Sequence, residues 1–72
     1  MAITVAAMQA ELGTNATNPQ VLRYFGAVGT FQEWLIHGNT TVGGRVKQIR
    51  TTAASDAATQ AAEVLTALRA GA

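Results

Sequence analysis

NPQVLRYFGAVGTFQEWLIHG, residues 18–38, holds every aromatic side chain of the 72-residue chain, its only proline and its only histidine. Any hydrophobic core must therefore be built on this stretch. Its large apolar side chains recur on one stripe at the helical period: Val21, Tyr24, Phe25, Val28, Phe31 and Leu35. Asn18 followed by Pro19 is typical of a helix start, and Gly38 of a helix end. We therefore expect one helix over residues 18–37.

Two glycines inside this stretch leave an alternative open. Gly26 and Gly29 each cost about 1 kcal/mol relative to alanine in a helix interior. Thr30 with Glu33 three residues later spells a capping box, which could restart a helix after a turn at Gly29–Thr30. If the helix is continuous instead, the two glycines share one face and form a shallow groove for another backbone.

The segments on either side predict two further helices. In TVAAMQAELG, residues 4–13, Thr4 is the expected N-cap and Gly13 the C-cap of a helix over residues 4–12. Its apolar side chains fall at i, i+3 and i+7: Val5, Met8 and Leu12. The last segment predicts a helix over residues 53–70, capped by Ser55 or Asp56 and ended by Gly71. Small and aliphatic residues at alternating spacings of three and four form its seam: Ala54, Ala57, Ala61, Val64 and Leu68.

Residues 39–52, NTTVGGRVKQIRTT, fit two patterns. Threonine pairs and a Gly43–Gly44 turn favour a hairpin, whereas Val42, Val46 and Ile49 also fit a helical stripe. We expect an extended or hairpin-like arm. The predicted fold is therefore mostly α: a single small helical domain over residues 1–72 with three helices, 4–12, 18–37 and 53–70, and an arm at 39–52.

The composition excludes most kinds of chemistry. The chain has no cysteine, one histidine, four carboxylates and a net charge of +1. We therefore expect no disulfide, metal or cofactor, no small-molecule substrate and no enzymatic activity. His37 lacks a nucleophile or carboxylate at a recognisable motif spacing. No apolar run is long enough to span a membrane, and the N-terminal segment lacks the basic start of a signal peptide.

The thin core points instead to assembly. A chain of this length buries only about 60% of its unfolded surface, so packing against other chains would add needed stability. We expect a homo-oligomer that also contacts other assembly proteins. The interface candidates are Tyr24, Gly26, Gly29, Phe31, Trp34, Arg45, Lys47, Arg50, Ala54, Ala57, Ala61, Val64 and Leu68. The basic cluster among them, Arg45, Lys47 and Arg50, could also make weak, sequence-independent contacts with DNA phosphates.

Two family resemblances carry functional expectations. TVAAMQAELG followed by LRYFGAVGTFQEWL resembles, in layout, the small helical head–tail connector proteins of tailed bacteriophages. This implies a non-enzymatic structural protein, a multi-copy neck connector or minor capsid (cement) component, located in the virion if phage-encoded and otherwise cytoplasmic. The alternative is a small helix-turn-helix DNA-binding regulator, because TVAAMQAELG and NPQVLRYF also resemble the two helices of that motif.

Overall fold

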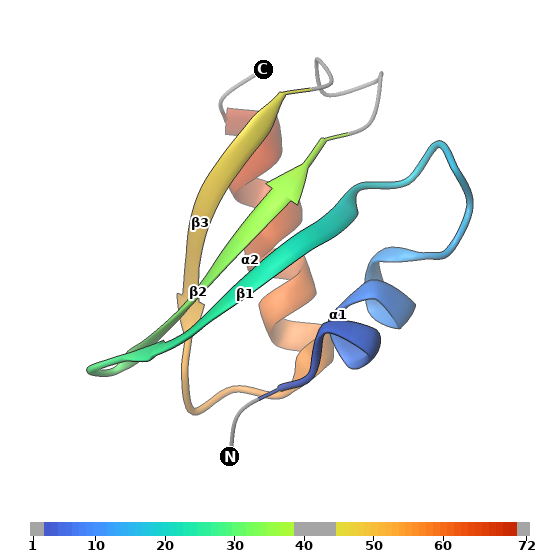
Figure 1. The fold of residues 1–72 in the computed structure, drawn as a ribbon. Helices are drawn as coiled ribbons and strands as arrows, with labels where there is room; N and C mark the ends of the chain where they lie inside the picture. The colour runs from blue at the N-terminus through green and yellow to red at the C-terminus, as the bar shows by residue number, and fades with distance from the viewer. Residues whose placement is uncertain (1–2, 39–44, 71–72) are drawn as a thin grey trace.

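The computed structural model describes residues 3–38 and 45–70. Along the chain come α1 (Val5–Leu12), β1 (Gln20–Val28), β2 (Phe31–His37), β3 (Val46–Thr52) and α2 (Ala57–Ala70). The strands form one antiparallel sheet in the order β1-β2-β3. Both helices contact each other and pack on one face of this sheet, and the opposite face carries no helix (Figure 1). The protein is therefore a two-layer α/β structure, and the prediction of a mostly α fold with three helices is wrong.

The two outer helices form close to where the sequence predicts them. Thr4 caps α1, its hydroxyl accepting a hydrogen bond from the amide of Ala7 at 3.1 Å, and Gly13 follows the helix with a φ of +102°. Asp56 caps α2 by accepting from the amide of Thr59 at 2.8 Å. Side-chain caps of this kind satisfy amides that have no partner within the helix. The predicted end of the last helix at Gly71 lies outside the described residues.

The central helix predicted over 18–37 is a β-hairpin. Asn18 and Pro19 do not start a helix, because β1 begins at Gln20 and pairs with β2 from Gln20–His37 to Val28–Phe31. The segment NPQVLRYF therefore supplies a strand rather than the recognition helix of a helix-turn-helix. The alternative of a turn at Gly29–Thr30 is the correct one. Gly29 has a φ of +62° and Thr30 a negative φ, the combination expected for the two-residue hairpin turn with glycine at its first position.

Two β-bulges explain why β1 has the period of a helix. The register with β2 shifts between Val21 and Arg23 and again between Tyr24 and Gly26. Each bulge adds a residue to β1, so the residues facing the helices, Val21, Tyr24 and Ala27, are spaced by three instead of two. A spacing of three is close to the helical period of 3.6, so Val21 and Tyr24 fitted the predicted helical stripe. The other members of that stripe lie on the opposite face of the sheet: Phe25, Val28, Phe31 and Leu35.

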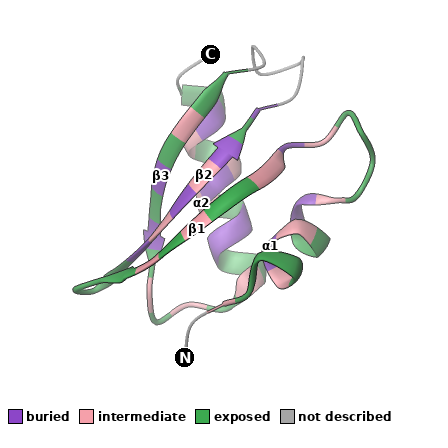
Figure 2. Ribbon diagram, in the orientation of Figure 1, coloured by how far each residue is buried: buried purple, intermediate pink, exposed green. Residues whose placement is uncertain are grey.

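In β2 the strand pattern is regular but is disguised by a buried polar residue. Buried positions alternate with intermediate ones along the strand, and its two end residues are exposed (Figure 2); the buried Gln32, Trp34 and Ile36 face the helices. Gln32 is buried because its side chain bonds to backbone groups on both sides: its amide donates to the carbonyl of Ala53, and its oxygen accepts from the amide of Ile3. A glutamine at a core position breaks the alternation of apolar and polar residues that identifies a strand.

The region predicted as an extended arm is in part the third strand. β3 pairs with β2 without any shift of register, from Val46–His37 to Thr52–Phe31. The predicted turn at Gly43–Gly44 lies outside the described residues. The arm is therefore not free over 46–52, because it forms one edge of the sheet.

Side chains from both helices and two strands form the core. Its buried apolar members are Met8, Leu12, Trp34, Ile36, Ile49, Ala61, Val64 and Leu68. A row of buried hydrogen bonds crosses this core: Trp34 Nε1 donates to the hydroxyl of Thr51 at 2.8 Å, and that hydroxyl donates to Gln60 Oε1 at 2.7 Å. The amide of Gln60 in turn donates to the carbonyls of Thr52 and Ser55. These bonds join β2, β3 and α2 with fixed geometry, since each polar group in this row has a defined partner.

Candidate functional site: the open face of the sheet

The face of the sheet turned away from the helices is the most distinctive surface of the described chain. We call it the open face. Strand alternation and the register place these side chains on it: Leu22, Arg23, Phe25 and Val28 of β1; Phe31, Glu33, Leu35 and His37 of β2; and Val46, Gln48 and Arg50 of β3. Five of the six exposed large hydrophobic residues of the described chain lie here; the sixth, Val5, is on α1.

The two bulges of β1 increase the number of large apolar side chains on the open face. Leu22 and Arg23 together oppose Leu35, and Phe25 and Gly26 together oppose a single residue of β2. In a bulge two residues of one strand face one residue of its partner. Each bulge therefore adds a large apolar side chain to the open face. Gly26 has a φ of +99°, a backbone conformation that permits the second bulge and that other residues rarely adopt.

The charges of the open face are matched within the chain. Glu33 accepts a hydrogen bond from Gln48 Nε2 at 2.6 Å, and its carboxylate lies 3.6 Å from Nε of Arg50. The guanidinium of Arg50 also lies 5.9 Å from the ring centre of Phe31. The side chain of Arg50 is 62% exposed, whereas that of Glu33 is only 12% exposed. These contacts leave the carboxylate with partners when another molecule covers the face, so covering it does not bury an unpaired anion.

On β1, at the other side of the open face, Arg23 lies beside a phenylalanine in the same way as Arg50 does. Its guanidinium lies 5.0 Å from the ring centre of Phe25, within the range of a cation–π contact. The face thus presents two phenylalanines, each with an arginine beside it, among aliphatic side chains. Aromatic residues and arginine are enriched at protein interfaces, whereas lysine is depleted there.

Several predicted interface residues are instead part of the core. Trp34, Ala61, Val64 and Leu68 are buried by the protein's own helices and strands. Tyr24 is half-buried, with its ring 4.5 Å from that of Trp34. The four buried side chains are therefore not available to another molecule in this fold, whereas Tyr24 remains partly accessible.

Three other predicted interface residues lie on or near the open face: Gly26, Gly29 and Phe31. Gly26 is in the second bulge, and Gly29 is in the turn that ends the hairpin. Phe31 is exposed immediately after that turn. Ala54 is exposed in the connection between β3 and α2, and Ala57 is half-buried at the start of α2.

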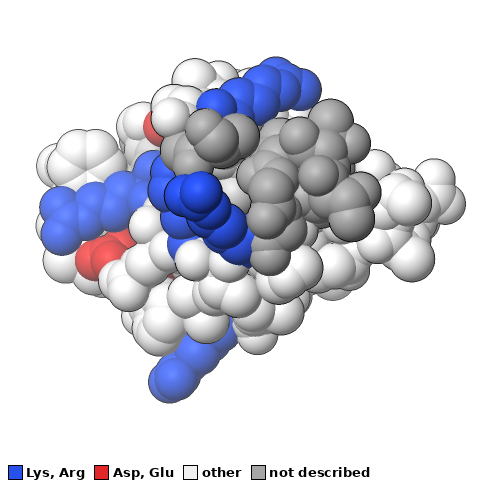
Figure 3. Space-filling model, turned by 90° about the horizontal axis from the view of Figure 1, so that it is seen from above, with Lys and Arg blue, Asp and Glu red and all other residues white. Residues whose placement is uncertain are grey.

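The structure separates the predicted basic cluster. Lys47 points to the helix side, where Nζ donates to the carbonyl of Ala67 at 2.9 Å, whereas Arg50 lies on the open face. Arg45 is exposed just before β3, and its carbonyl accepts from the amide of Gly38. In Figure 3 the Lys and Arg side chains project in several directions and do not gather into one patch over the visible described residues. Weak contact with DNA through these residues stays a prediction.

Four aliphatic residues and one aromatic residue of the open face were not among the predicted interface residues: Leu22, Val28, Leu35, Val46 and Phe25. Their exposure follows from the bulges and from strand pairing, which the helical interpretation could not reveal. The spacing of three among Leu22, Phe25 and Val28 is a sequence signal that could have pointed to the three of them that lie in β1.

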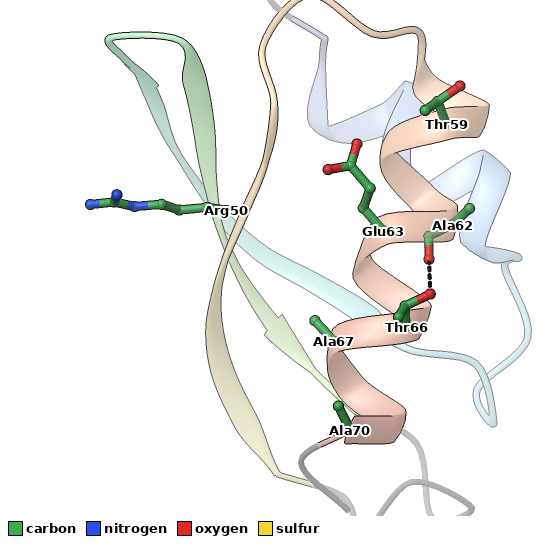
Figure 4. Close-up of a pocket in the computed structure, with 7 residues that line it drawn as sticks. All are labelled: Arg50, Thr59, Ala62, Glu63, Thr66, Ala67 and Ala70. Atoms are coloured by element: carbon green, nitrogen blue, oxygen red, sulfur yellow. Dashed lines mark hydrogen bonds between the residues drawn. The ribbon is translucent and has the colours of Figure 1, made fainter.

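A groove between the free edge of β3 and α2 is the second candidate surface. It measures about 500 Å³ and is lined by Arg50 of β3 and by Thr59, Ala62, Glu63, Thr66, Ala67 and Ala70 of α2 (Figure 4). No group of His, Cys, Asp and Glu within residues 3–38 and 45–70 could hold a metal ion. The groove offers small side chains and one carboxylate, and that carboxylate already bonds to Thr52.

Comparison of the chain with protein-family models, with curated proteins and with solved structures found no match. None of the helices in the described part of the chain has the length and hydrophobicity needed to cross a membrane. The open face and the groove are therefore the two surfaces of the described chain that bear on function.

Proposed function

We propose that this protein is a non-enzymatic assembly protein whose open face is covered by protein in a multi-copy oligomer. The observation that carries the proposal is the concentration of exposed hydrophobic side chains on one uncovered face of the sheet. A virion neck or capsid is one setting for such a protein. The resemblance that suggested that setting rested on three helices, so the open face alone supports the proposal here.

The size of the open face suits such a role. Three strands about 4.8 Å apart and seven residues long cover about 14 Å by 23 Å, or roughly 300 Å². The whole face, polar side chains included, thus only reaches the lower end of the roughly 300–600 Å² of the largest apolar patch on a typical monomer, which is often functional. Covering the face with a second sheet gives the packing of a β-sandwich, in which the two inner faces interdigitate. Because Glu33 keeps its partners Gln48 and Arg50, covering the face costs less desolvation free energy than burying an unpaired carboxylate would.

Analytical ultracentrifugation of matched variants tests the proposal. Phe31→Glu places a charge on the open face, and Val5→Glu places the same charge on α1. The two original side chains are equally exposed, at 42% and 41%, and neither belongs to the core. We expect the wild type and Val5→Glu to sediment as oligomers of the 7.5 kDa chain and Phe31→Glu as a smaller species. If the wild type stays a monomer up to millimolar concentration, or if Phe31→Glu sediments like Val5→Glu, the proposal is wrong.

A further inference from the structure

The backbone of β3 has one paired side and one free side. The amide of Ala53 donates to the carbonyl of Thr30 in the hairpin turn, and the carbonyl of Arg45 accepts from Gly38 next to β2. Odd-numbered residues of β3 therefore bond towards β2. Because backbone groups alternate along a strand, the even-numbered residues Val46, Gln48 and Arg50 direct their amides and carbonyls away from it.

Within residues 3–38 and 45–70, the chain closes this edge at one end only. The amide of Thr52 donates to the carboxylate of Glu63 at 3.2 Å, and its carbonyl accepts from the side chains of Ser55 and Gln60. Among the described residues, no hydrogen bond reaches the outward backbone groups of Val46, Gln48 and Arg50. A regular, unpaired edge of this kind is a template for pairing with another strand.

The opposite edge of the sheet is protected. Two bulges interrupt β1, and the outward amide of Val21 donates to Gln9 Oε1 at 2.7 Å. Bulges bend and twist an edge and prevent regular pairing. In contrast, β3 has no bulge, and the groove beside it leaves room next to α2 for the body of an added chain. Strand addition is therefore expected at β3 and not at β1.

We propose that β3 pairs with β3 of a second copy, antiparallel about a two-fold axis at Gln48, to give a continuous six-stranded sheet. This inference rests on the proposed function, because one two-fold interface makes only a dimer and a multi-copy assembly needs a second surface. The second copy fits the edge because Gln48 then faces Gln48, and Arg50 faces Val46. A register centred on Arg50 would instead place two guanidinium groups opposite each other.

A proline at the axis tests the pairing. Gln48→Pro removes an amide that points away from β2, and proline is tolerated at such positions of edge strands. Gln48→Ala is its control, since it also removes the side-chain bond to Glu33 but keeps the amide. Ultracentrifugation gives the oligomeric state of each variant, both as a single substitution and in combination with Phe31→Glu. We expect Gln48→Pro and Phe31→Glu each to stop at dimers, the combination to be monomeric, and Gln48→Ala to resemble the wild type.

Cross-linking gives an independent reading that does not depend on how proline is tolerated. The chain has no cysteine, and directly opposed residues of a hydrogen-bonded antiparallel pair have Cα atoms about 5.5 Å apart, which suits a disulfide. In the Phe31→Glu background we expect Gln48→Cys to form disulfide-linked dimers at least tenfold faster than Ala16→Cys in an exposed loop.

The outcomes separate the two proposals. Equal cross-linking rates, or a Phe31→Glu variant that is already monomeric, would refute pairing at β3 while leaving the open face as the oligomer interface. A Phe31→Glu variant that sediments like the wild type would refute the role of the open face. If, in addition, Gln48→Pro dissociates the oligomer, β3 remains as the self-association site.

Discussion

Replacing Thr51 with valine should show how much the buried hydrogen-bond row contributes to stability. The side chains have nearly the same shape, so the change removes the hydroxyl while leaving little cavity. Trp34 Nε1 then loses its acceptor and Gln60 Oε1 its donor, and both side chains are fully buried. Rotating the side-chain amide of Gln60 would not restore these hydrogen bonds, because its nitrogen already donates to the carbonyls of Thr52 and Ser55.

The expected loss is large for a protein of this size. Each buried group left without a partner costs about 1–3 kcal/mol, which gives about 2–6 kcal/mol for the two groups that Thr51→Val leaves unpaired. Stabilities of about 0.05–0.15 kcal/mol per residue correspond to roughly 4–11 kcal/mol for 72 residues. The variant should therefore lose a large fraction of its stability and unfold at much lower urea concentration.

Urea unfolding followed by the fluorescence of the single tryptophan measures this loss. Thr66→Val is the control, because Thr66 is exposed on α2 and bonds only to the carbonyl of Ala62; its expected effect is within about 0.5 kcal/mol. All curves are taken at one low protein concentration, since self-association adds to apparent stability. A change below about 0.5 kcal/mol for Thr51→Val would refute the account of the core given above.

Two further predictions concern acid stability and backbone conformation. The hydrogen bonds from Thr59 lower the pKa of Asp56 below its ordinary value of 3.8, so its stabilising effect is present above that pH and is lost as the pH falls through the lowered pKa. The urea midpoint should therefore fall more for the wild type than for Asp56→Asn between pH 6 and about pH 2.5, and equal falls would contradict the assignment. Gly26→Ala should cost about 1–2 kcal/mol through its positive φ alone. Gly13→Ala should cost more, because a new Cβ there would also overlap the side-chain amide of Asn18. Thermal unfolding of the two variants ranks their stabilities, and a less stable Gly26→Ala would contradict this expectation.

The parts of the fold that sequence reasoning found are those set by local chemistry. Thr4 and Gly13 bound α1, and Asp56 begins α2, because caps are satisfied within a few residues of the chain. The glycine–threonine pair that turns the hairpin was visible as an alternative for the same reason. Its positive φ is a local requirement that glycine meets at low cost.

The two strands of the hairpin, β1 and β2, were missed because tertiary contacts set their pattern. The bulges beside Leu22 and Phe25 exist only through pairing with β2, and they change the period of β1 from two to three. Gln32 is tolerated in the core only because Ile3 and Ala53, distant in sequence, satisfy its amide. The open face depends on both effects, so its aliphatic members could not be identified before the strands were known.

The position of α2 in the chain constrains how the protein is made. Its residues Ala61, Val64 and Leu68 complete a core whose other members lie between Met8 and Ile49. While a ribosome is still synthesising α2, the hairpin can form from local contacts, but its helix-facing side has nothing to cover it. A nascent chain therefore presents two apolar sheet faces before α2 docks and one afterwards.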